Sequence, residues 1–94
     1  MSEAEAEFVY EGKKIIIQCN PDNKMIDIIK SFELKEGFKK EELYYMYGGG
    51  MVNENLTFNT QANKIDAERK KISILVNKRI NEDSNDGKKS LKKI

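Results

Sequence analysis

The stretch LYYMYGGG, residues 43–50, decides the fold of this chain. A sheet strand with one face in the core and the other in water alternates apolar and polar side chains. Residues 44–47 are instead all apolar or aromatic, and three glycines then end the run. The stretch therefore predicts a strand that is apolar on both faces, followed by a turn. A short chain has little else to cover the outer side chains, so we expect them to be available for a partner.

Upstream of this stretch, two β-rich runs flank the Glu-Gly pair at residues 11–12, which predicts a hairpin. A two-residue turn would place Phe8 opposite Ile15, whereas a three-residue turn would place Val9 there, and the sequence leaves both registers open. Polar residues alternate with apolar ones in the second run. Its inward side chains are therefore expected to be Ile15, Ile17 and Cys19.

Between the hairpin and this stretch, apolar residues recur at the spacing of one helix face. They are Met25, Ile28, Ile29 and Phe32. Residues 20–23 offer an N-cap for this helix, and Gly37 is placed to end it. Further on, Leu56 and Phe58 are expected to anchor a polar loop, residues 66–71 to form a charged turn, and residues 72–76 to form a last strand.

The length of 94 residues allows one small domain. We expect this domain to occupy residues 8–80. Residues 1–7 carry three glutamates and predict a flexible acidic lead-in. Residues 81–94 are polar and rich in lysine, which predicts a disordered tail or linker.

Composition excludes several classes of chemistry. One cysteine and no histidine leave no disulfide within the chain, no zinc site of the Cys/His type and no His-dependent catalytic triad. The three glycines lack the lysine and the helix that follow a phosphate-binding loop, so they predict a plain turn. The net charge is +1, and no apolar run reaches the roughly 18 residues of a spanning helix. We expect a monomer without metal, cofactor, nucleic-acid or membrane partner, located in the cytoplasm or nucleus.

The predicted order is hairpin, helix, strand, short strand, irregular loop and strand. In this order and spacing the sequence resembles the ubiquitin family, and within it ubiquitin and SUMO. The residues that carry the resemblance are Gly12, Lys13, Pro21, residues 35–38, residues 43–47, Gly49 and residues 72–76. The resemblance implies an α+β fold, the ubiquitin-like β-grasp, in which one main helix packs across a mixed sheet of four to five strands.

The resemblance also implies a binding surface. Ubiquitin is recognised through an apolar patch on the outer sheet face, and the matching positions here are Met46 and Leu75. Ser73 takes the place of the patch histidine and stands at the edge, and Tyr44 adds an aromatic side chain. Tyr10 lies near the position of a further patch leucine. The partners implied are proteins of the ubiquitin-receptor, proteasome or segregase kind.

A pair of glycines at the C-terminus lets conjugated members of the family be attached to other proteins. Residues 77–80 lack such a pair, so the sequence predicts a non-conjugated protein-interaction module and not an enzyme. The alternative is a covalent modifier with a non-standard terminus processed at Gly87. A third reading, a Ras-binding or PB1-like domain, fits less well, because the acidic cluster of PB1 partners is reduced here to Glu54.

Overall fold

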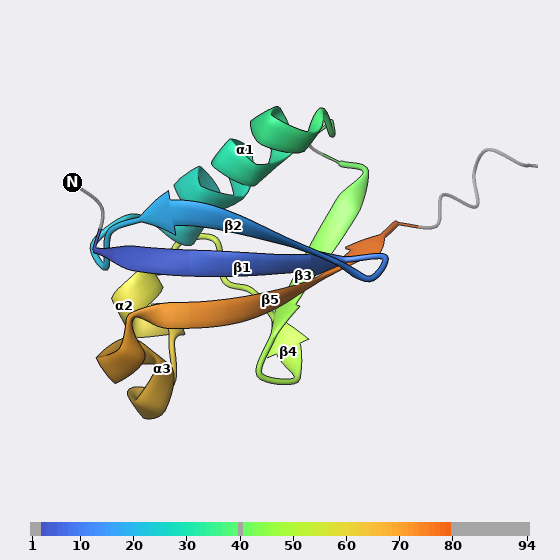
Figure 1. Cartoon of the computed structure of the whole chain (residues 1–94). Coiled ribbons are helices and arrows are strands. Elements are labelled where there is room, and N and C mark those ends of the chain that lie inside the picture. Colours follow the sequence, from blue (N-terminus) through green and yellow to red (C-terminus); the bar gives the residue numbers. More distant parts are fainter. Residues whose placement is uncertain (1–2, 40, 80–94) are drawn as a thin grey trace, which may run out of the picture.

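The computed structural model describes residues 3–39 and 41–79, and its sheet and main helix form two layers (Figure 1). In chain order the elements are β1 (Ala4–Tyr10), β2 (Lys13–Cys19), α1 (Met25–Glu36), β3 (Leu43–Tyr47), β4 (Gly50–Met51), α2 (Phe58–Gln61), α3 (Lys64–Arg69) and β5 (Lys71–Lys78). The strand order is β2-β1-β5-β3-β4, with β1 and β5 parallel and the other neighbours antiparallel. The predicted α+β class, a mixed sheet crossed by one main helix, is confirmed.

The first hairpin has the two-residue turn. Glu11 and Gly12 have φ angles of 49° and 82°, the positive values that a two-residue type I′ turn requires. Phe8 consequently faces Ile15 across the strands, so the register that the sequence left open is decided.

The first strand begins earlier than the sequence predicted. Residues 4–7 were expected to belong to a flexible lead-in, but β1 starts at Ala4 and pairs with β2 on one side and with β5 on the other. Ala4 and Ala6 are 3% and 0% exposed and belong to the core, while Glu5 and Glu7, which alternate with them, point to the outer face. The domain start at residue 8 is therefore corrected to Ala4. Small alanines gave a weak apolar signal between charged neighbours.

The predicted face of α1 is buried as expected: Met25, Ile28, Ile29 and Phe32 all lie in the core. The Phe32 ring stacks on Phe8 of β1 with centroids 4.4 Å apart. Gly37 ends the helix in the left-handed conformation, with φ at 79°, as predicted. Glu33 is also buried, and the Tyr45 hydroxyl donates a hydrogen bond of 2.9 Å to its Oε2 atom.

The start of α1 differs from the prediction. Residues 20–23 do not cap it, because the N-cap position is Lys24 and its side chain accepts no capping hydrogen bond. The Met25 and Ile26 N–H groups instead donate to the carbonyls of Leu56 and Glu54, at 2.8 and 3.1 Å. A loop far along the chain thus satisfies the orphan donors of the first helical turn.

The chain after β4 is more helical than expected. Phe58 is fully buried and anchors this region as predicted, but it begins the short helix α2. The charged turn expected at residues 66–71 is wrong, because most of it belongs to α3, which the Asn63 side chain caps by accepting from the Asp66 N–H. The predicted domain end at residue 80 and the tail at residues 81–94 lie outside the described residues. Within the described part, no helix is long and apolar enough to cross a membrane.

Candidate functional site: the outer face of the sheet

The centre of the outer sheet face is apolar across four strands. Strand register joins Val9 of β1 to Leu75 of β5, Leu75 to Met46 of β3, and Met46 to Met51 of β4. Because side chains alternate along each strand, these four lie on the face opposite the buried core residues. Leu75 and Met51 are 52% and 58% exposed, and Val9 and Met46 are half-buried. We call this set the outer row. At the β2 edge it ends on Lys14, which pairs with Val9.

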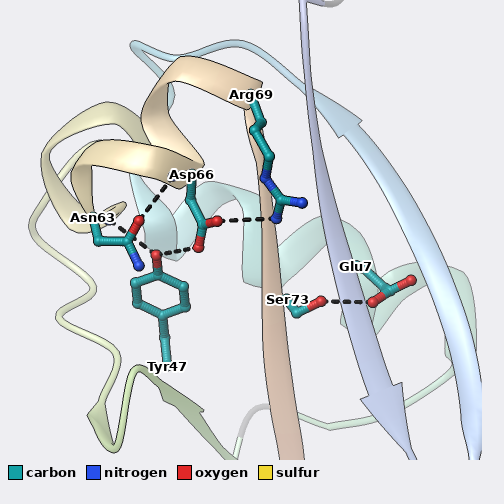
Figure 2. Close-up of polar contacts among 6 residues, drawn as sticks. All are labelled: Glu7, Tyr47, Asn63, Asp66, Arg69 and Ser73. Atoms are coloured by element: carbon teal, nitrogen blue, oxygen red, sulfur yellow. Dashed lines mark hydrogen bonds and ion pairs between the residues drawn. The ribbon is translucent and has the colours of Figure 1, made fainter.

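Tyr44 and Ser73 lie on the same face, on opposite sides of the outer row. Tyr44 is half-buried and pairs with Asn77 of β5. Ser73 is exposed, and its hydroxyl donates a 2.6 Å hydrogen bond to the Glu7 carboxylate, as Figure 2 shows. This hydrogen bond is the main cause that lowers the pKa of Glu7, with smaller contributions from nearby lysines. The outer row is therefore apolar in the middle and hydrogen-bonded or charged at its rim.

The structure brings the four predicted site residues onto one face, and Met46 lies directly opposite Leu75. Their role in binding stays a prediction. Sequence reasoning missed Val9 and Met51, and only the apolar character of Met51 just after the three glycines could have indicated it. Tyr10 does not join the patch, because its ring packs on Phe38 with centroids 5.2 Å apart. Val9, on the opposite side of β1, lies in the outer row instead.

A second group of polar side chains connects the end of β3 to α3 (Figure 2). The Tyr47 hydroxyl donates to Asp66 at 2.6 Å and accepts from the Asn63 N–H at 2.9 Å. The other oxygen of Asp66 pairs with Arg69 at 2.9 Å. Burial and the Asp66 hydrogen bond raise the pKa of Tyr47. The Tyr47 hydroxyl and both Asp66 carboxylate oxygens have partners in the fold, so the role of this group is to anchor α3 to the sheet.

The structure offers little that could act as a nucleophile or metal site. Cys19 is buried, and desolvation raises the pKa of its thiol to about 11, which keeps it protonated near neutral pH. Among residues 3–39 and 41–79, no group of three or more His, Cys, Asp and Glu side chains is placed to hold a metal ion.

Comparisons with known proteins define the class of fold. No protein-family model matches the sequence, and no curated protein matches it. The crystal structure of ATBAG1 in complex with HSP70 matches with a TM-score of 0.67 at 12% identity, over 81% of this chain and 40% of that chain. A solution structure of a ubiquitin-like domain from Arabidopsis thaliana matches with a TM-score of 0.65 at 9% identity, over 87% of both chains. The chain has a ubiquitin-like β-grasp fold.

Proposed function

We propose that this domain is a non-conjugated protein-interaction module and not an enzyme, and that the outer row together with Tyr44 forms its binding surface. The observation that carries the proposal is the Met46–Leu75 pair, which lies in the middle of the sheet with Leu75 half exposed. Apolar side chains surrounded by a polar rim are typical of protein interfaces. Ser73 and Glu7 supply such a rim on one side.

The partner proposed is a protein. One structural neighbour was solved as a complex with HSP70, which is a property of that protein and is compatible with an interaction role for the fold. The resemblance to ubiquitin favours partners of the ubiquitin-receptor, proteasome or segregase kind. We propose that the domain binds them as a monomer, in the cytoplasm or the nucleus. The modifier alternative depends on Gly87, which lies outside the described residues. A ladder of higher mass after incubation of the full chain with a cell lysate and ATP would support that alternative.

Chemical-shift mapping tests the binding surface. The isotope-labelled chain is titrated with a panel of ubiquitin-binding domains, and the amides of Met46, Leu75 and Val9 are expected to shift. Replacing Met46 with aspartate places a charge in the apolar centre and is expected to weaken binding by tenfold or more. Leu34→Asp is the matched control, because Leu34 is an apolar residue that is 85% exposed on α1. Equal losses in the two variants, or shifts confined to another face, would contradict the proposal.

Met46 is half-buried, so its aspartate variant could also destabilise the fold. Met51→Asp provides an independent test, because Met51 is 58% exposed and neighbours Met46 on β4. Far-UV circular dichroism checks that each variant is folded. If Met46→Asp unfolds the domain and Met51→Asp binds normally, the surface proposed here is wrong.

A further inference from the structure

A groove of about 320 Å³ lies between α1, the start of β3 and the segment after β4. Its walls include Lys30 and Glu33 of α1, Tyr45 of β3, Val52 and Glu54 after β4, and Arg79. Tyr44 and Met51 border both this groove and the outer sheet face. The groove is therefore continuous with the proposed binding surface, but Met46 and Leu75 are not part of its lining.

The groove runs along the part of β3 that β4 does not pair. β4 pairs only with the last two residues of β3, Met46 and Tyr47. Beyond them, the Val52 N–H donates to the Tyr45 carbonyl at 3.0 Å, and the Arg79 side chain donates to the Leu43 carbonyl at 3.2 Å. Both of these carbonyls are therefore already occupied, so a ligand in the groove would be held by the side chains that line it.

A buried carboxylate lines the same groove. Glu33 is only 7% exposed, and within the described part of the chain its side chain receives one hydrogen bond, from the Tyr45 hydroxyl at 2.9 Å. A carboxylate has about four acceptor positions, and burial without partners is costly. Lys30 stands one helical turn earlier, but neither of the two ion pairs among the described residues includes Lys30 or Glu33. Glu33 can therefore accept a donor that enters from the groove.

The charged side chains that line the groove favour a positively charged ligand. Glu33, Glu41 and Glu54 line the groove against Lys30 and Arg79, and the Arg79 Nε atom is already hydrogen-bonded to the Leu43 carbonyl. We propose that the groove takes an extended peptide of a partner protein and that this peptide places a lysine or arginine side chain against Glu33. The apolar side chains of the lining supply contact area, and the charge-assisted hydrogen bond to Glu33 supplies specificity.

A random heptapeptide library displayed on phage and selected on the full chain tests this inference. The selected peptides are expected to share a lysine or arginine flanked by β-branched or aromatic residues. Synthetic versions are then titrated into the isotope-labelled chain, where the Tyr45 amide is expected to shift. Replacing the basic residue of the peptide with norleucine is expected to weaken binding by tenfold or more.

Variants of the chain identify the contact. Glu33→Gln keeps the size of the side chain and an acceptor for the Tyr45 hydroxyl, and it is expected to weaken peptide binding by tenfold or more. Glu36→Gln is the matched control, because Glu36 is exposed on the same helix and does not line the groove. Lys30→Ala removes a competing cation and is expected to strengthen binding or leave it unchanged. Leu75→Asp, at a residue that is 52% exposed and outside the groove lining, is expected to weaken binding at the outer row and to leave peptide binding unchanged, so the groove and the outer row can fail independently.

Several results would overturn the inference. They are a selection that yields no peptide, peptides without a basic residue, and an equal loss in Glu33→Gln and Glu36→Gln. Shifts confined to Ile16 and Gln18 would place the peptide on the opposite sheet edge, along β2. A dimer whose dissociation on dilution shifts the Tyr45 amide would assign the groove to a second copy of the chain. The norleucine peptide keeps the test decisive if Glu33→Gln does not fold.

Discussion

Replacing Ala6 with aspartate should severely destabilise the domain, although sequence patterning places this residue in a flexible acidic lead-in. Ala6 is 0% exposed and lies between Ile17 of β2 and Ile72 of β5. An unpaired carboxylate buried there costs several kcal/mol. For a domain of this size each kcal/mol lowers the melting temperature by about 4–8 °C, so a cost of about 3 kcal/mol lowers it by roughly 12–24 °C.

The control for this variant is Glu5→Asp, which places the same side chain one position earlier, on the partly exposed outer face. It should change the stability by no more than about 0.5 kcal/mol. Thermal unfolding followed by circular dichroism measures both variants. An Ala6→Asp protein that melts within a few degrees of the parent would show that β1 does not include Ala6.

The pH dependence of Ala6→Asp separates charge from shape. Burial raises the folded-state pKa of the new carboxyl above its unfolded value of about 3.9. Below that value the carboxyl is neutral in both the folded and the unfolded chain. As the pH rises from that value to the folded-state pKa, the unfolded chain ionises while the folded chain stays protonated, so the folded state loses stability. The loss of unfolding free energy relative to the parent should therefore be smallest near pH 3, begin to grow at a pH of about 3.9, and be largest near neutral pH. A deficit that does not vary with pH would indicate a purely steric effect.

Three further variants or measurements test the polar contacts. Tyr47→Phe removes a hydroxyl with two hydrogen bonds and should cost about 1–2 kcal/mol in urea unfolding, and an unchanged midpoint would contradict the anchoring role. Cys19 should react with a thiol reagent at pH 8 on the order of a hundredfold more slowly in the folded chain than in urea, and equal rates would refute its burial. Ser73→Ala should raise the pKa of Glu7 toward 4.5 in an NMR titration. Ionised Glu7 stabilises the fold of the parent at pH values above its unfolded-state pKa, and this stabilisation is lost as the pH falls through the folded-state pKa. The stability of the Ser73→Ala variant should therefore depend less on acid pH. An unchanged pKa of Glu7 would exclude the hydrogen bond as the cause of the shift.

Much of the fold could be predicted because its signals are local. The 3.6-residue period of Met25, Ile28, Ile29 and Phe32 determined the buried face of α1, and Gly37 determined where the helix ends. Such patterns depend on residues within two turns of one another. The same local reasoning failed at Ala4 and Ala6, because alanine between glutamates resembles a polar segment until two neighbouring strands cover it.

The candidate site could be predicted only in part. Alternation placed Tyr44 and Met46 on the outer face, and the resemblance added Leu75 and Ser73. Val9 and Met51 could not be found in this way, because their neighbours come from other strands. The buried Glu33 was also missed, since a charged residue on a helix usually faces water.

The sequence by itself determined the order of the strands and the main helix and the apolar character of both faces of β3, but not the short helices α2 and α3. Turn residues and side-chain periodicity act over a few positions, so they can be read directly along the chain. Only the tertiary structure decided which residues meet across strands: Val9 with Leu75, and Tyr45 with Glu33. The physical reason is that strand register and packing join residues far apart in the chain. The run at residues 43–47 therefore predicts an exposed apolar surface, while its neighbours from β1, β5 and α1 determine the shape of that surface.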